Sequence, residues 1–267
     1  MADTERYKLN DRAAQVYEEG PVPLMFRPLA ELTFRHVTLQ TNDRVMDAAC
    51  GTGIVTRVAI ERFKSLGKVV GVDLTAEMLD VARQSMPKSN VRVEWQHADL
   101  CALPFPDGGF DVVLCQQGLQ FIPDKAGAVR EMKRMLVFGG RFIFTAWIES
   151  PYHTALADAL TRHVNAQAAR SCLAPYNLHD REVVRKLVSD AGFSDIDMKT
   201  LSMTIRVSPS SAASLFEIVA ARSSFAREIA GVSKVLKQEV DAALQKYRDG
   251  GDFMVPWKTH LVQARAE

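Results

Sequence analysis

Short runs of apolar residues alternate with amphipathic stretches along the first part of the chain. The apolar runs have the length of strands and stand at residues 44–50, 68–74, 90–100, 110–117 and 139–147. Between them, apolar residues recur every three or four positions, which predicts helices over residues 54–66, 75–86 and 125–136. Because continuous apolar strands alternate with helices, the pattern favours a parallel sheet with helices on both faces.

The pattern is less regular on either side of this alternation. Further helices are expected at residues 10–19, 24–37, 150–175, 180–191 and, as a pair, 209–248. Strands are expected over residues 194–207 and 252–266, where Pro256 favours an edge position or a bulge. The sequence therefore predicts an α/β fold with a doubly wound, mostly parallel sheet of seven strands and helical cap segments.

The predicted organisation is one domain over residues 1–267. Its ligand-binding core is expected at residues 41–147, because ligands of doubly wound sheets bind outside the carboxyl ends of the strands. Residues 1–40 would form an N-terminal helical lid. Residues 148–179 and 208–250 would form cap helices that select the substrate.

Composition favours a cytoplasmic protein with a small-molecule substrate. The 33 basic and 32 acidic residues give a net charge of +1, which offers no electrostatic footprint for nucleic acid. No apolar run reaches the length of a membrane span, and the polar start has no signal-peptide pattern. The four cysteines show no C-x-x-C spacing, so we expect reduced thiols and no metal site. A homodimer is kept as a candidate assembly.

The stretch VMDAACGTGIVTR joins the first strand to the next helix and carries an acid before a Gly-x-Gly turn. Asp47, Ala49, Cys50, Gly51 and Gly53 stand at this joint. Glycine permits a tight turn and close approach of a ligand, and the amides of the following helix favour an anionic group. The alternative is an ordinary strand-to-helix turn without a ligand.

Acidic and amide side chains follow the next strands. Asp73 ends the second strand, where a carboxylate can accept hydrogen bonds from both hydroxyls of a ribose; the alternative is a helix N-cap. Asp99 follows the third strand and suits the exocyclic amine of adenine. Gln116 ends the fourth strand.

Two nucleotide cofactors compete for this site. A dinucleotide fold requires a third glycine where Thr56 stands, and Asp47 would repel a pyrophosphate. An adenosyl ligand with a sulfonium and an ammonium would instead be attracted by acids at the loop. The residues therefore favour S-adenosylmethionine. A nucleotide-dependent oxidoreductase remains an alternative, as does an adenosyl-binding protein with a non-methylating reaction.

The chain resembles the class I S-adenosylmethionine-dependent methyltransferases, in particular the ubiquinone/menaquinone-biosynthesis-like branch that methylates small molecules. The family's D-x-[GA]-x-G-x-G motif corresponds to DAACGTG at residues 47–53, and its ribose acid to Asp73 in VVGVDLTAEML. Its LPFPDGGFDVV segment corresponds to residues 103–113. The resemblance covers about residues 40–147 and constrains the caps weakly.

The resemblance implies a Rossmann-like methyltransferase fold and methyl transfer to a carbon, oxygen, nitrogen or sulfur of a small, partly apolar or aromatic metabolite. It extends the cofactor site to Leu74, Met78, Ala98 and Leu100. Related enzymes also close an N-terminal segment over the cofactor, which adds Tyr17 and Phe26.

The same family builds its substrate pocket after the fifth strand. This makes His153 and His163 candidate bases, with surface histidines on a helix as the alternative.

Overall fold

The computed structural model describes residues 11–208, 215–216 and 225–267 of the chain. The described chain divides into two units. The first runs to Ala146 and also contains Arg181–Lys199 and Leu261–Glu267. The second contains Trp147–Asp180 and Thr200–His260. We describe each unit by itself.

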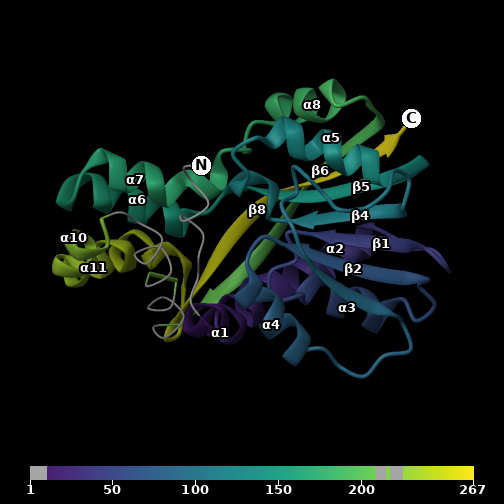
Figure 1. The fold of residues 1–267 in the computed structure, drawn as a ribbon. Helices are drawn as coiled ribbons and strands as arrows, with labels where there is room; N and C mark the ends of the chain where they lie inside the picture. Colours follow the sequence, from purple (N-terminus) through teal and green to yellow (C-terminus); the bar gives the residue numbers. More distant parts are fainter. Residues whose placement is uncertain (1–10, 209–214, 217–224) are drawn as a thin grey trace. The chain divides into compact units, whose positions relative to one another are not determined.

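The apolar runs form one sheet with the strand order β3-β2-β1-β4-β5-β8-β6, and a short strand, β7, pairs with β8 (Figure 1). Neighbouring strands from β3 to β5 run parallel, as the continuous Val-rich runs predicted. The strands are β1 (Arg44–Ala48), β2 (Lys68–Asp73), β3 (Val93–His97), β4 (Phe110–Gln116), β5 (Leu136–Glu149), β6 (Phe193–Val207), β7 (Arg248–Asp249) and β8 (Asp252–Ala266).

The last strands differ in two details from the prediction. The sequence predicted seven strands, and the two-residue β7 is the strand that it missed. The edge position suggested by Pro256 is wrong, because β8 lies between β5 and β6 in the strand order. Pro256 removes one backbone hydrogen-bond donor from β8. The strand is nevertheless 15 residues long and largely buried, which is typical of an inner strand.

Helices of the first unit flank the strands. Figure 1 shows α3 and α4 on one side of the strands, and α5 and α8 on the other. Within this unit α1 contacts α4, and α2 contacts α3. The helices are α1 (Asp11–Glu19), a π-helical turn η2 (Val22–Phe26), α2 (Arg27–His36), α3 (Ile54–Arg62), α4 (Ala76–Gln84), a 3₁₀ turn η3 (Leu119–Phe121), α5 (Lys125–Met135) and α8 (Arg181–Asp190).

The second unit holds the remaining helices. The single helix expected over residues 150–175 is two helices, because Asn165 ends the first by capping the second: its side chain accepts a hydrogen bond from the Ala168 amide at 2.8 Å. A break at Gly231 is confirmed, whereas residues 209–214 and 217–224 of that prediction lie outside the described residues. The elements are α6 (Pro151–His163), α7 (Ala166–Leu173), η4 (Ala174–Tyr176), α10 (Ala226–Gly231), α11 (Ser233–Ala243) and η5 (Gln245–Tyr247).

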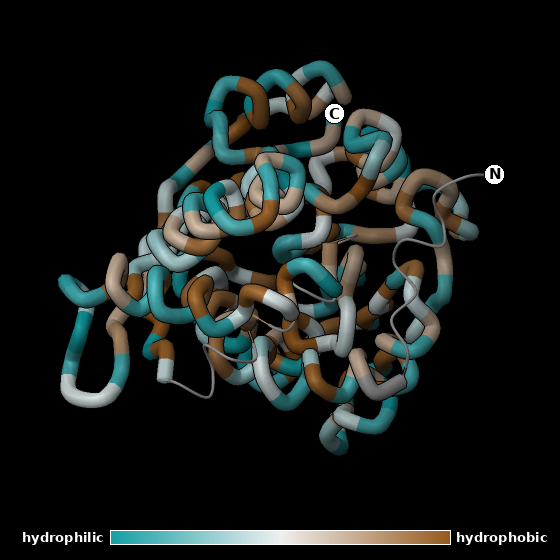
Figure 2. Tube along the Cα trace, turned by 90° about the vertical axis from the view of Figure 1, so that its left-hand side faces the viewer, coloured by the Kyte–Doolittle hydropathy of each residue, from teal (hydrophilic) through white to brown (hydrophobic). Residues whose placement is uncertain are grey.

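Hydrophobic burial fits the periodicities that predicted these elements. In β1, residues Val45 to Ala48 are all buried, as expected for a central strand covered on both faces. Figure 2 shows hydrophilic and hydrophobic positions interspersed along the helical turns, which is typical of helices with one face against a core. Over the described residues, no helix combines the length and apolar character needed to cross a bilayer.

Candidate functional site

The strand order reverses between β1 and β4, and the loops that follow these two strands meet. A Cβ atom on Gly118, after β4, would overlap the methyl group of Ala49, after β1. Ala49 and Gln117 both adopt left-handed backbone conformations, with φ of 56° and 55°. Such strained residues are typical of ligand sites, and the reversal point is where doubly wound sheets bind ligands.

The two predicted glycines adopt the left-handed conformations that the turn requires. Gly51 has φ +54° and Gly53 has φ +81°. Gly53 also lies against the indole of Trp95 on β3, and a Cβ there would overlap the ring. Trp95 covers Gly71 of β2 in the same way. Gly53 is therefore a packing glycine, whereas a Cβ on Gly51 would meet, among the described residues, only the Tyr17 ring, at 3.9 Å.

We expect Gly53→Ala to lower the free energy of unfolding by about 1–3 kcal/mol, because it combines backbone strain with overlap against Trp95. Gly139→Ala is the matched control: Gly139 has φ +74°, but no atom of the described part of the chain lies within 4 Å of an added Cβ. Urea unfolding measures both. An equal loss in the two variants would contradict the packing role of Trp95.

Asp47 lies at the end of β1 with 1% of its surface exposed. Its Oδ2 accepts hydrogen bonds from the Thr56 amide at 3.0 Å and from the Thr56 hydroxyl at 2.7 Å. Its Oδ1 is buried and has no hydrogen-bond partner among the described residues. Burial raises the pKa of Asp47 to about 7, in spite of the bonds from Thr56. One carboxylate oxygen is thus held by α3, and the other is left for a cation or a donor.

Asp73 closes the glycine turn from the neighbouring strand. Its Oδ2 accepts the Gly51 amide at 2.8 Å, and its Oδ1 accepts the Thr75 amide at 2.9 Å. Burial raises the pKa of Asp73 above the ordinary value. Asp73 therefore links the turn after β1 to the start of α4, and it remains our candidate for the ribose hydroxyls.

The segment after β3 is tied to the end of β2. The Ala98 amide donates to the Asp73 carbonyl at 3.1 Å, and His97 Nε2 lies 2.8 Å from the carbonyl of Leu74, which is 42% exposed. Asp99 is exposed and accepts the Cys101 amide at 2.8 Å, and Leu100 is buried. Asp73 ends β2, and Asp99 follows the end of the paired strand β3 by two residues.

The N-terminal candidates gather at the same end of the first unit. Tyr17 of α1 packs on a buried cluster that includes Met78 of α4, and its ring centroid lies 5.2 Å from that of Phe26. The Phe26 carbonyl accepts a hydrogen bond from Gln116 Nε2 at 3.0 Å. The structure thus brings Tyr17 beside Gly51, with Phe26 and Met78 packed against Tyr17 and Gln116 bonded to Phe26. Cys50 is buried, and its side chain lies toward Gly71.

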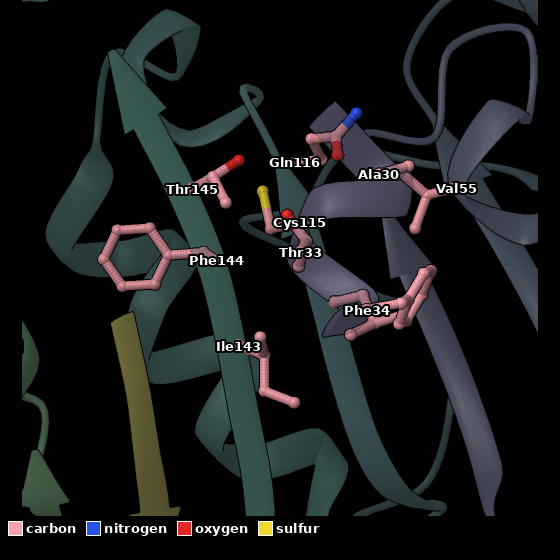
Figure 3. A pocket seen from close by; sticks show the side chains of 10 residues that line it. Ala30, Thr33, Phe34, Val55, Cys115, Gln116, Ile143, Phe144 and Thr145 are labelled. Carbon is pink, nitrogen blue, oxygen red and sulfur yellow. The ribbon is translucent and has the colours of Figure 1, made fainter. Parts of the chain in front are cut away.

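A small cavity lies beneath this end of the sheet, between α2, α3, β4 and β5 (Figure 3). Its volume is about 10 Å³, which is room for one water molecule. Thr33 of α2 and Gln116 of β4 line it, and Thr33 Oγ1 and Gln116 Oε1 are buried without a hydrogen-bond partner among the described residues. The cavity suits a bridging water and is too small for a substrate.

In the second unit, His153 lies among aromatic side chains. Its Nδ1 is 2.9 Å from the Tyr176 hydroxyl, which accepts the Trp257 Nε1 proton at 3.2 Å and also bonds with the side chain of Ser150. Tyr152 packs edge-on against the imidazole at 5.4 Å. Burial lowers the pKa of His153 to about 4, so the ring is neutral at pH 7.

His163 has different surroundings in the same unit. Its Nε2 lies 2.7 Å from Glu239 Oε1 of α11, and Arg162 binds the same carboxylate. The side chains of His163 and Glu239 are each 30% exposed. The arrangement is an ion-pair cluster that joins α6 to α11.

Sequence reasoning missed four residues of this site: Thr56, Trp95, Arg57 and Gly118. In the sequence Thr56 is only the residue in place of a third glycine, whereas in the structure its hydroxyl donates a hydrogen bond to Asp47. Arg57 is buried and binds the Thr52 carbonyl at 2.6 Å. Arg57 could have been identified from the sequence, because it is a basic residue four positions after Gly53 in a largely apolar helix start. The packing of Trp95 and Gly118 could not, because it depends on the tertiary structure.

Comparison with known proteins finds a family model that matches part of the chain and a protein with a similar sequence. A family model described as a methyltransferase domain matches residues 46–144. The ubiquinone/menaquinone biosynthesis C-methyltransferase UbiE of Escherichia coli O1:K1 / APEC is 33% identical over 174 residues, which cover 59% of this chain and 69% of that protein.

Solved structures confirm the fold class. A putative methyltransferase from Bacillus halodurans C-125 matches with a TM-score of 0.59 and 22% identity, covering 89% of this chain and 98% of that chain. The phosphoethanolamine N-methyltransferase 2 of Haemonchus contortus, solved with S-adenosyl-L-methionine, has a TM-score of 0.60 and 17% identity, covering 99% of this chain and 60% of that chain. With the E. coli relative, these observations lead to one conclusion: the chain belongs to the S-adenosylmethionine-dependent methyltransferases.

Proposed function

We propose that this methyltransferase transfers the methyl group to a carbon atom of a small, partly apolar or aromatic metabolite. The observation that carries the proposal is the 33% identity with a relative named as a C-methyltransferase. The family assignment sets aside the nucleotide-dependent oxidoreductase. Methylation of oxygen, nitrogen or sulfur, and a non-methylating reaction, are outcomes that the experiment below distinguishes.

The first unit fits the cofactor. Asp47 Oδ1 and Thr52 Oγ1 are buried without partners among the described residues; Asp47 precedes the glycine turn, and Thr52 lies within it. The ammonium group of the amino-acid tail suits an unpartnered carboxylate oxygen, which would regain a hydrogen bond and a charge partner. The glycine at position 51 leaves space beside Tyr17. The residues of this chain thus match S-adenosylmethionine by charge and by space.

Each candidate residue has a role in this proposal. Asp47, with the backbone of Ala49, Cys50, Gly51 and Gly53, would hold the amino-acid tail. Asp73 would hold the ribose, while Ala98, Asp99 and Leu100 would line the adenine with Leu74 and Met78. Gln116, Tyr17 and Phe26 would close the site on the side of the N-terminal helices. The bound cofactor supplies an activated methyl group, so the protein contributes positioning and exclusion of water.

Isotope transfer tests the reaction. The purified chain is incubated with a metabolite extract and S-adenosylmethionine carrying a ¹³CD₃ methyl group, and products are analysed by mass spectrometry. We expect a labelled product whose methyl group resists hydrolysis and lies on carbon in its fragment spectrum. Label on a heteroatom would overturn the C-methylation proposal. Cofactor binding without any labelled product would support the non-methylating alternative.

We also propose that His153, rather than His163, acts as the base when the substrate must lose a proton. The Tyr176 hydroxyl can donate its proton to Ser150 and accept from both Trp257 Nε1 and His153 Nδ1. In that arrangement the proton of the neutral imidazole is on Nδ1, and Nε2 carries the lone pair of a base. Over the described residues, the hydrogen bonds of this ring involve only Nδ1.

His153→Ala is expected to lower kcat about 100-fold or more with little change in cofactor affinity, which is the usual contribution of a general base. His163→Ala is the control and should change kcat little, because His163 already pairs with Glu239. Steady-state kinetics on the product found above measures both. A larger loss in His163→Ala than in His153→Ala would reverse the assignment.

The domain prediction also stays a proposal. We propose that the chain works as one methyltransferase domain over residues 1–267, with a core at residues 41–147 and an N-terminal lid at residues 1–40. Residues 148–179 and 208–250, within the second unit, would select the substrate. A cytoplasmic location is supported by four cysteines that are all free. Sedimentation of the purified chain would test the homodimer.

A further inference from the structure

A buried arginine lies behind the glycine turn. Arg57, one turn into α3, is 5% exposed. Its Nη1 donates to the Thr52 carbonyl at 2.6 Å, between the two glycines of the turn. A guanidinium presents several donors in a fixed plane, so this bond fixes the orientation of the peptide that follows Thr52.

The other end of the guanidinium binds a helix far away in sequence. Arg57 Nη2 donates to Glu18 Oε1 of α1 at 2.6 Å, and the side chains of Arg57 and Glu18 are 7% and 18% exposed. Glu18 Oε2 is also buried and has no partner among the described residues. Removal of one member of such a pair leaves the other as a poorly compensated buried charge. Arg57 therefore requires Glu18, and through it α1, to keep its place under the turn.

The same helix places a second group at the turn. Tyr17, next to Glu18, is the side chain that a Cβ on Gly51 would meet, and it packs with Met78. The α1 helix thus reaches the turn from two directions, through the Arg57–Glu18 pair on one side and through Tyr17 on the other. The Thr52 peptide lies between these contacts.

We propose that Arg57 is a positioning residue for the cofactor turn, and that the Arg57–Glu18 pair makes the binding conformation of the turn depend on docking of α1. The inference rests on the cofactor-binding role proposed above. Because linkage is reciprocal, a ligand that favours the ordered turn must also favour docked α1. Arg57 would act through the Thr52 peptide and need not touch the cofactor.

The test compares Glu18→Ala with Glu19→Ala on the same helix. Within the described residues Glu19 bonds only to Gln15 of α1, whose Nε2 donates to it at 2.7 Å, so Glu19 controls for loss of a helical carboxylate. Binding of S-adenosylhomocysteine is measured by titration calorimetry, and amide exchange of residues 11–19 is measured with and without it. We expect Glu18→Ala to weaken binding about fivefold or more and to abolish the ligand-induced slowing of exchange. Glu19→Ala should match the wild type in both.

Arg57→Lys is the second variant, for the case that Glu18→Ala does not fold. Lysine keeps the charge but cannot bind Thr52 and Glu18 in the same forked geometry, so binding should weaken to a similar degree. Faster exchange of α1 with unchanged affinity in these variants would show that the pair only packs the helix, and would overturn the proposal. A wild-type chain that binds no S-adenosylhomocysteine would instead overturn the cofactor assignment, and the linkage with it.

Discussion

Asp47→Asn is expected to make the ligand-free protein more stable at pH 8 and, at the same time, to weaken its binding of cofactor. Burial raises the pKa of Asp47 to about 7 in the folded protein, from an ordinary value of 3.8 for an exposed aspartate. Ionising this buried carboxyl group thus costs on the order of 4 kcal/mol of folding free energy. Asparagine does not ionise, and its oxygen can still accept the bonds from Thr56.

The sign of the pH dependence follows from proton binding. Between about pH 4 and pH 7 the folded protein keeps a proton on Asp47 that the unfolded chain has released. The contribution of this group to stability therefore falls as the pH rises through that range, and the full cost is present above pH 7. The difference in the free energy of unfolding between Asp47→Asn and the wild type should increase over the same pH range.

Urea unfolding of both proteins from pH 4 to pH 9 measures this difference in the free energy of unfolding. Subtracting one pH profile from the other removes the contributions of other carboxyl groups. Calorimetric titration with S-adenosylhomocysteine should show at least tenfold weaker binding by Asp47→Asn, because a charge-assisted hydrogen bond contributes about 1.5–3 kcal/mol. Parallel unfolding curves, or equal affinities, would contradict this account of Asp47.

Asp73→Ala is expected to weaken binding of S-adenosylhomocysteine about 10- to 100-fold. The substitution removes the proposed ribose contact, worth about 1.5–3 kcal/mol. It also leaves the Gly51 and Thr75 amides without their acceptor, so the turn loses a fixed point. Both effects lower affinity.

Two controls separate these effects. Asp73→Asn keeps one acceptor oxygen for the backbone and should bind with intermediate affinity. Asp80→Ala removes an exposed carboxylate of α4 that pairs with Arg83, and should bind like the wild type. Calorimetry gives the affinities, and thermal unfolding reports whether each variant is folded. An unchanged affinity in folded Asp73→Ala would remove Asp73 from the ribose site.

The sheet and the strand-end acids could be predicted because their signals are local. Asp47 and Asp73 directly follow apolar runs, and parallel strands place such residues at one edge, where register pairs Asp47 with Gly71, two residues before Asp73. The glycine turn could be predicted from the sequence for the same reason. A pattern of residue types over a few positions is enough to define a strand end.

The partners of these acids could not be predicted, because they depend on tertiary distances. Thr56 binds Asp47 nine residues back along the chain, and Glu18 binds Arg57 across 39 positions. Neither pair shares a helix or strand periodicity. The split at Asn165 was missed for a different reason: the apolar pattern continues through the break, and only the capping side chain marks it.

The indole of Trp95 lies against Gly53 and Gly71, so one aromatic chromophore rests on the cofactor turn. The chain has two other tryptophans, Trp147 and Trp257, and both are buried in the second unit. Replacing these two with phenylalanine would leave Trp95 as the single tryptophan, with surroundings that include Gly53, the N-cap of α3. Its emission wavelength would then report rearrangement of the turn during a titration, without an attached dye.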